Sequence, residues 1–138
     1  NKNKILKLNS KENKKLNDST TVVTKDKNEK ILQIVYFDFD KAELTLVAIK
    51  KIGEFLKKNK DTIKKFLILG YTDTVGTNDY NYKLSILRAN KVKKILIQLG
   101  IDSNNINIIG KGEKDLRIQT EDEISHPINR RAEIRPLN

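Results

Sequence analysis

Short runs of hydrophobic residues along the chain predict four β-strands. The β-branched and aromatic run at 31–37 offers the first strand, and a third lies at 106–109. The run at 66–70 is wholly apolar and bounded by glycine, which is typical of a central strand buried on both faces. The segment 131–135 alternates charged with apolar residues, which predicts a last strand with one buried face.

Two longer stretches place hydrophobic residues at helical spacing. The first spans about 42–58 and has a lysine-rich outer face. The second begins near Thr77 or Asn78, either of which can cap a helix, and ends at Gly100. Its predicted apolar face contains Leu84, Leu87, Val92, Ile95, Leu96 and Leu99.

The order of these elements, β-α-β-α-β-β, predicts an α+β fold. We expect a two-layer sandwich in which a mixed sheet carries both helices on one face. Three polar segments would then converge on one rim of the sheet: the turn at 38–41, the loop that contains Asp73, and the corner at 129–130. A polar excursion at 114–127 separates the last two strands.

Composition divides the 138 residues into two parts. Residues 1–30 hold nine lysines, four acidic residues and little periodic hydrophobicity, so we expect a flexible tether. Residues 31–138 suffice for one domain with a core. The net charge of +10 is shared equally between the two parts, and a charge so diffuse is a weak argument for nucleic-acid binding.

The absence of cysteine excludes disulfides, thiolate metal sites and cysteine nucleophiles. No run of the sequence approaches the roughly 20 apolar residues that a membrane helix requires. We therefore expect a soluble chain that is attached to a membrane only through a tether or an anchor outside this sequence.

The most informative segment is the glycine-flanked loop 70–76, which places Asp73 directly before the second helix. On that helix, Asn81, Ser85 and Arg88 fall on one polar stripe, because steps of four and three keep side chains on the same face. An acid and a guanidinium suit a ligand that bears both charges. Because Arg88 lies about three turns into the helix, it meets Asp73 only through a ligand, or if the loop folds back along the helix.

Structural roles compete with this interpretation. Asp73 alone would favour a role in stabilising the helix N-terminus, and Arg88 could form a surface ion pair with Glu113 or Glu133. The combination with the polar stripe and the glycine-bounded loop favours a binding site.

Several motifs, taken in order, resemble one known family. They are 35–41 (VYFDFDK), 70–76 (GYTDTVG), Tyr80-Asn81, Leu84-Ser85, Arg88-Ala89, 110–113 (GKGE) and 129–134 (NRRAEI). Their order and spacing resemble the OmpA-like peptidoglycan-binding domain of OmpA-type outer-membrane proteins, peptidoglycan-associated lipoproteins and MotB-type flagellar stator proteins. The resemblance covers residues 31–138, and its least typical part is the excursion 114–127.

The resemblance implies noncovalent binding of peptidoglycan through the meso-diaminopimelate of its stem peptide, with no catalysis, cofactor or metal. Asp73 would take the ammonium group of the diamino acid, and Arg88 would bind its carboxylate through the two-pronged guanidinium fork. The other implied contacts are Asn81, Arg130, Thr72, and Phe39 with Asp40 in the turn after the first strand. The resemblance also implies a periplasmic protein associated with the outer membrane or cell envelope, with other envelope proteins as further candidate partners.

Two other function classes remain as alternatives. The strand followed by Asp38 and Asp40 is similar to the Asp-x-Asp signature of haloacid-dehalogenase-type phosphatases that use magnesium, although the later lysine and acidic pair of that signature are missing. The basic charge suggests a binder of nucleic acid or of acidic membranes, but the chain lacks a stacking aromatic platform and a dense basic stripe.

Individual residues near the predicted site are ambiguous. Side chains alternate along a strand, so one of Arg130 and Arg131 would face the site while the other pairs across the sheet. Tyr80 suits the core better than a contact. We assign no metal to His126, the only histidine, because it has no neighbouring cysteine or histidine.

Overall fold

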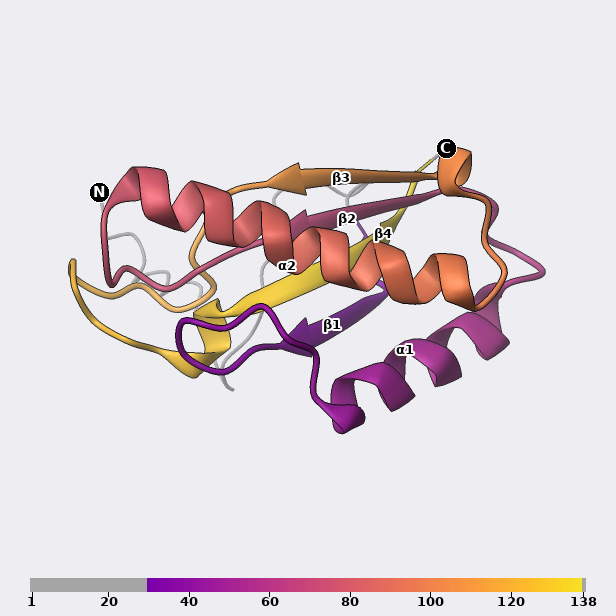
Figure 1. Ribbon diagram of the computed structural model, residues 1–138, viewed down its shortest axis with the longest axis horizontal. Coiled ribbons are helices and arrows are strands. Elements are labelled where there is room, and N and C mark those ends of the chain that lie inside the picture. Colours follow the sequence, from indigo (N-terminus) through magenta and orange to yellow (C-terminus); the bar gives the residue numbers. More distant parts are fainter. Residues whose placement is uncertain (1–29, 138) are drawn as a thin grey trace.

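The computed structural model describes residues 30–137, which form a four-stranded sheet and two α-helices (Figure 1). The strands are β1 (Gln33–Tyr36), β2 (Phe66–Gly70), β3 (Ile106–Gly110) and β4 (Arg131–Pro136). The helices are α1 (Leu46–Asn59) and α2 (Asn78–Gln98), with the short 3-10 helices η1 (Ser103–Asn105) and η2 (Pro127–Asn129). The predicted tether, residues 1–30, lies outside the described residues apart from Lys30.

The sheet is mixed, as predicted, and its strand order is β1-β4-β2-β3. β4 pairs antiparallel with β1 and with β2, whereas β2 and β3 are parallel and are connected through α2. β1, β2 and β3 therefore end on the side of the sheet where β4 begins, at the left of Figure 1. The loops after β1 and β2 meet the corner before β4 at this rim.

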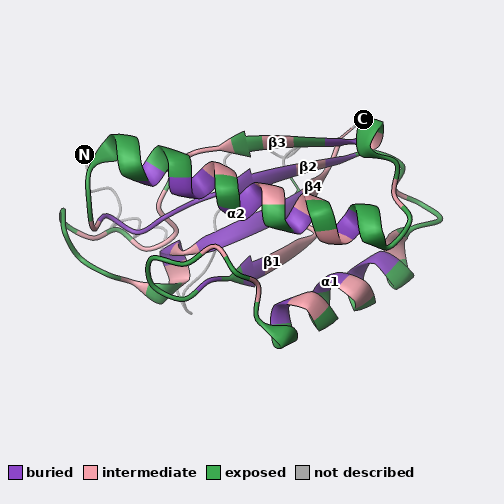
Figure 2. Cartoon of the chain, in the orientation of Figure 1, coloured by how far each residue is buried: buried purple, intermediate pink, exposed green. Residues whose placement is uncertain are grey.

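Both helices cover the same face of the sheet, which confirms the predicted two-layer α+β sandwich (Figure 2). The core lies between the two layers. Its buried side chains include Val35 of β1, Ile52 of α1, Phe66 of β2, Val92 of α2 and Ile134 of β4. β2, predicted as a central strand, lies between β4 and β3 and is buried along nearly its whole length.

Glycines let α2 approach the sheet closely. A Cβ atom at Gly70, the last residue of β2, would lie 1.9 Å from the backbone oxygen of Ser85 in α2. At Gly110, at the end of β3, it would lie 2.4 Å from the side chain of Ile86. Any other residue at these positions would push the helix away from the strands.

The first helix begins later than predicted. Residues 42–45 are not helical, because the Thr45 side chain accepts a hydrogen bond from the amide of Ala48 (3.1 Å) and caps α1 there. Leu44 still packs against the core from the segment before the cap. An apolar residue that packs on the core just before the cap therefore extended the predicted helix beyond its true start.

α2 begins as predicted, since the Thr77 hydroxyl accepts from the amide of Tyr80 (3.1 Å), but its buried side differs. Leu87 and Leu99, predicted in the apolar face, are 52% and 48% exposed, so that part of the prediction was wrong. The buried side is partly polar. It comprises Asn81, Leu84, Ser85, Arg88, Ala89, Val92 and Leu96.

The charged face of β4 is buried too, so the prediction of a strand with one buried face was wrong. Arg131 and Glu133 are only 2% and 1% exposed on the side of the sheet away from the helices. Their charges neutralise each other through an ion pair (2.8 Å), and Arg135 adds a second (2.6 Å). The excursion 114–127 contributes a further partner, since Arg131 donates to the backbone oxygen of Asp115 (3.0 Å).

Candidate functional site

The candidate site lies at the rim where the loops after β1 and β2 meet the corner before β4. The loop after β2 is tied to both neighbours. The amide of Tyr71 donates to the backbone oxygen of Arg131 (2.9 Å), and the amide of Thr72 donates to that of Gly112 (2.8 Å). The predicted convergence of polar segments is therefore present.

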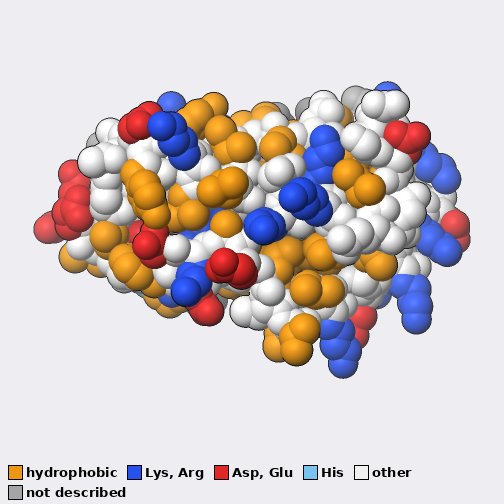
Figure 3. Space-filling model, viewed as in Figure 1, with side chains coloured by type: hydrophobic (Ala, Val, Ile, Leu, Met, Phe, Trp, Pro, Cys, Tyr) orange, Lys and Arg blue, Asp and Glu red, His pale blue; other side chains and the backbone are white. Residues whose placement is uncertain are grey.

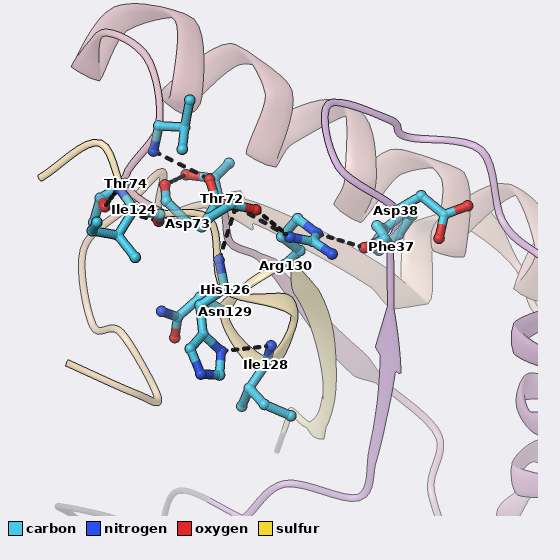
Figure 4. A network of polar contacts seen from close by, with 12 residues as sticks. Phe37, Asp38, Thr72, Asp73, Thr74, Ile124, His126, Ile128, Asn129 and Arg130 are labelled. Carbon is cyan, nitrogen blue, oxygen red and sulfur yellow. Dashed lines mark hydrogen bonds and ion pairs between the residues drawn. The ribbon is translucent and has the colours of Figure 1, made fainter. Parts of the chain in front are cut away.

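Asp73 is buried, with 4% of its surface exposed, and its carboxylate accepts from three donors (Figure 4). The amide of Val75 donates to Oδ1 (3.2 Å), and the amide of His126 donates to Oδ2 (3.3 Å). The guanidinium of Arg130 forms an ion pair with Oδ2 (3.4 Å). A carboxylate has about four acceptor positions, so roughly one remains for a further donor.

The loop that carries Asp73 folds back along α2, which is one of the two arrangements that the sequence allowed. Asn81, near the start of α2, donates from Nδ2 to the backbone oxygen of Asp73 (3.3 Å) and to Glu113 (2.9 Å). Arg88, two turns further along, donates to the backbone oxygen of Tyr71 (2.9 Å). Residues 71–73 therefore run antiparallel to the helix, and the side chain of Thr72 hydrogen-bonds the backbone oxygen of Asp73 (2.8 Å).

The Arg88 guanidinium is fully buried and is held by backbone oxygens rather than by an acid. Nε donates to Lys41 (2.8 Å), Nη1 to Tyr71 (2.9 Å) and Nη2 to Asp38 (3.2 Å). The group also lies over the ring of Phe37, 5.1 Å from its centroid. Since a guanidinium has five N–H donors, one N–H remains on each terminal nitrogen.

The suggested ion pairs of Arg88 are replaced by other contacts. Glu113 accepts from Asn81, and Glu133 lies on the opposite face of the sheet. Burial lowers the pKa of Arg88 to about 10, while the charge of Asp73 raises it and that of Arg130 lowers it. Arg88 is still a cation at neutral pH.

Arg130 faces the site and Arg131 faces away from it, so the two arginines divide as the alternation predicted. Arg130 donates from Nε to the backbone oxygen of Phe37 (2.9 Å) and from Nη1 to the hydroxyl of Ser125 (2.7 Å), besides its ion pair with Asp73. It thereby connects the loop after β1 with the loop that carries Asp73 (Figure 4).

The turn at 38–41 borders the site on the β1 side. Its closing hydrogen bond runs from the amide of Lys41 to the backbone oxygen of Asp38 (3.2 Å), and Asp40 has a left-handed backbone (φ 57°). Phe39 is 49% exposed. The side chain of Asp40 accepts a hydrogen bond from the hydroxyl of Tyr80 in α2. Tyr80 is 50% exposed, so its prediction as a core residue was wrong.

The excursion 114–127 also contacts the candidate site, which sequence reasoning did not foresee. The Thr74 hydroxyl donates to the backbone oxygen of Glu121 (2.7 Å) and accepts from the amide of Ile124 (3.0 Å). The contacts that Tyr71, Glu121 and His126 make here use backbone atoms. Backbone groups are present in every residue type, so no sequence signal could have identified these partners.

Two further properties bear on what this rim can do. Among residues 30–137, no cluster of three or more His, Cys, Asp or Glu side chains could hold a metal ion. Within the same residues, no helix is long and apolar enough to cross a membrane. Chemically, the rim combines a carboxylate with one acceptor position left and a guanidinium with two N–H groups left, which suits a small zwitterion.

Comparisons with known proteins agree with this architecture. Porin F of Pseudomonas aeruginosa is 36% identical over 103 residues, which are 72% of this chain and 29% of the porin. The peptidoglycan-associated lipoprotein of Haemophilus influenzae is 33% identical over 106 residues, 71% of this chain and 65% of the lipoprotein. The chain thus spans less than two thirds of either relative.

A solved structure and a family profile both match this chain, and both are of the OmpA type. The OmpA-like domain of FopA1 from Francisella tularensis superimposes with a TM-score of 0.66 and 34% identity, over 76% of this chain and 72% of that one. A sequence profile of the OmpA family matches residues 36–130, which include the turn at 38–41, the Asp73 loop, α2 and Arg130. The chain belongs to the OmpA family.

Proposed function

We propose that this domain binds peptidoglycan noncovalently by recognising the meso-diaminopimelate of the stem peptide, and so attaches an envelope protein to the cell wall. The observation that carries the proposal is that the short segment 71–73, which carries the buried carboxylate of Asp73, lies along α2 and is bonded to the buried guanidinium of Arg88. Each group keeps unused hydrogen-bonding capacity.

The relatives support the wall-binding part of the proposal. The lipoprotein that matches 71% of this chain is described as peptidoglycan-associated, and porin F is an outer-membrane protein. We therefore place the domain in the periplasm, next to the outer membrane or another part of the envelope. Other envelope proteins are candidate partners of the same domain.

The chemistry of the site supports the proposed recognition of meso-diaminopimelate. The end of a diaminopimelate that is not cross-linked carries an ammonium group and a carboxylate on one carbon atom. The ammonium would donate to the remaining acceptor position of Asp73, and the carboxylate would accept from the two remaining N–H groups of Arg88. Lysine lacks this carboxylate, so a lysine-containing stem peptide would leave the Arg88 charge without a partner.

The function is that of a binding domain and not of an enzyme, since the chain is an OmpA-family domain with porin and lipoprotein relatives. Membership of the OmpA family also argues against the phosphatase alternative, and the side chain of Asp40, one acid of the Asp-x-Asp pair, is engaged by the hydroxyl of Tyr80.

The nucleic-acid alternative finds little support on the surface that the helices cover. On this face, basic side chains are dispersed among hydrophobic and acidic ones (Figure 3). Salt separates the two functions. The affinity for nucleic acid, which depends on released counterions, would fall steeply between low and moderate salt. If the domain recognises the stem peptide, free diaminopimelate would still compete for binding at moderate salt.

Co-sedimentation with purified peptidoglycan tests the proposal. We expect the wild-type domain to pellet with diaminopimelate-containing peptidoglycan and free diaminopimelate to compete for it. Asp73→Ala and Arg88→Lys should each weaken binding about tenfold or more, because each removes charge-assisted hydrogen bonds of about 1.5–3 kcal/mol. Arg88→Lys keeps the positive charge and loses the fork.

Controls separate loss of binding from loss of folding. Asp79→Ala removes an acid that is 80% exposed in the first turn of α2, and it should pellet like the wild type. Circular dichroism and thermal unfolding must show that each variant is folded. Equal pelleting of folded Asp73→Ala, folded Arg88→Lys and wild type, or equal pelleting with lysine-type peptidoglycan, would contradict the proposal.

A further inference from the structure

The acceptors that orient Arg88 come mainly from one exposed turn. Two of its three backbone acceptors, Asp38 and Lys41, belong to the turn at 38–41, and the third is Tyr71 at the end of β2. Asp38 and Lys41 are both exposed. The direction in which the two remaining N–H groups point therefore depends on where this turn lies.

Arg88 itself joins the turn to α2 through its hydrogen bonds to Asp38 and Lys41, so a contact that holds the turn in place for Arg88 must be a different one. The closing hydrogen bond, from Lys41 to Asp38, lies within the turn and is not such a contact. Asp40 has φ 57°, a left-handed conformation that a residue with a Cβ atom adopts at some energetic cost. A conformation of this kind persists when the surroundings hold it in place.

The side chain of Tyr80 provides such a contact. Its hydroxyl donates a hydrogen bond to the Asp40 carboxylate and so connects the turn with the first part of α2, two turns before Arg88 on the same helix. This hydrogen bond is also the main cause that raises the pKa of Tyr80 above 10.0.

We infer that Tyr80 is a positioning residue of the ligand site: by holding Asp40, it fixes the turn whose backbone oxygens orient Arg88 for a ligand carboxylate. This inference rests on the proposed function and extends it to a residue that contacts Arg88 only indirectly. Tyr80 is half exposed and is no part of the core, so a role in folding alone does not explain the contact.

The chain offers a matched control. Tyr82 is on the same helix, two residues later, and is 51% exposed against 50% for Tyr80. Within residues 30–137, its hydroxyl has no hydrogen bond to the protein. Tyr82→Phe therefore removes the same atom from an equally exposed tyrosine of the same helix without touching the turn.

The experiment measures the affinity of the folded domain for a diaminopimelate-containing stem tripeptide by calorimetry. Tyr80→Phe loses one hydrogen bond, so its affinity for the tripeptide should be roughly two- to tenfold lower than that of the wild type. The affinity of Tyr82→Phe should be unchanged. Thermal unfolding should be the same for both. In NMR spectra, the Nε–H signal of Arg88 should shift and exchange faster with water in Tyr80→Phe only, which a purely structural role of Tyr80 would not produce.

A second pair of variants tests the route through Arg88. In an Arg88→Lys background, Tyr80→Phe should have no further effect on affinity, because the group that it positions is gone. Unchanged affinity of Tyr80→Phe would overturn the inference. Tighter binding would overturn it too, because the Tyr80–Asp40 pair would then obstruct the site. Failure of Asp73→Ala and Arg88→Lys to weaken binding would instead overturn the proposed function.

Discussion

At the scale of single residues, the two charges of the site differ in how the protein holds them. Asp73 is held by backbone amides and one guanidinium, whereas Arg88 is held by backbone oxygens. Neither charge is neutralised by the other, although Asp73 lies close enough to raise the pKa of Arg88. Arg88 therefore keeps its charge without an acidic partner, whereas Asp73 is paired with Arg130 and keeps about one acceptor position.

This separation leads to a prediction about the ligand itself. Amidation of the free carboxylate of diaminopimelate removes the negative charge that Arg88 would bind, and acetylation of its amine removes the positive charge that Asp73 would bind. We expect either modification to weaken binding about tenfold, since each loses a charge-assisted hydrogen bond. Competition by the modified and unmodified stem peptides in the co-sedimentation assay measures the difference.

Full competition by the acetylated peptide would show that Asp73 does not contact this amine. Full competition by the amidated peptide would show that Arg88 does not contact this carboxylate, even if peptidoglycan binding itself persists.

At the scale of elements, the sequence predicted a strand or helix most accurately where a single local signal determined it. β2 was predicted to the residue because 66–70 needs apolar side chains on both faces, and α2 was located by its cap at Thr77. The prediction failed where a side chain makes its contact outside the helix face to which its spacing assigned it. Leu44 reaches the core from outside α1, and Tyr80 serves the turn at 38–41. Periodicity cannot distinguish such roles from membership of a helix face.

The contact between α2 and the sheet gives a prediction about two glycines. Gly70→Ala would place a Cβ atom 1.9 Å from the Ser85 backbone, so the helix must move, and we expect a loss of stability near the upper end of the roughly 1–3 kcal/mol that overpacking costs. Gly53→Ala in α1 meets no atom within 4 Å and should gain about 0.5–1 kcal/mol from helix propensity. Urea unfolding of both variants measures these changes.

The two substitutions are the same chemical change, so they control for each other. Equal effects of Gly70→Ala and Gly53→Ala on stability would mean that α2 does not pack against β2 as closely as described. We also expect Gly70→Ala to weaken ligand binding, because β2 leads directly into the Asp73 loop.

At the scale of the whole molecule, the sheet separates two polar networks. The candidate site lies at the rim, and a second network of Tyr71, Arg131, Glu133 and Arg135 lies on the face away from the helices. The guanidinium of Arg131 lies 3.7 Å from the centre of the Tyr71 ring. Burial and the charge of Glu133 raise the pKa of Tyr71, while burial lowers the pKa of Arg131 and Glu133 opposes this.

Glu133 is the acid that this second network depends on, so its removal should destabilise the fold. Glu133→Ala leaves the buried guanidinium of Arg131 without its ion-pair partner, and we expect a loss of about 3–5 kcal/mol of unfolding free energy. Asp79→Ala breaks the exposed pair with Lys83 and should cost less than about 1 kcal/mol. Chemical denaturation compares the two, and similar small losses would contradict the role of Glu133.

The alternation of Arg131, Glu133 and Arg135 identified the strand, but it could not reveal that this face is buried. Charged residues on alternate positions normally mark a solvent-exposed face. Here the single carboxylate of Glu133 is paired with both Arg131 and Arg135, and Asp115 of the excursion supplies a backbone acceptor to Arg131. Burial of this kind depends on partners distant in sequence, which a local pattern does not contain.

The support of Arg88 by main-chain oxygens has a consequence for how this site tolerates change. Carbonyl groups belong to all residue types, so the identity of the side chains at 38, 41 and 71 is not what orients the guanidinium. The side chains at 38 and 41 can therefore change without moving the guanidinium, as long as the path of the main chain is kept, whereas the Tyr71 side chain is held by its contact with Arg131. The orientation of Arg88 is thus protected against substitution at two of the three positions whose oxygens hold it.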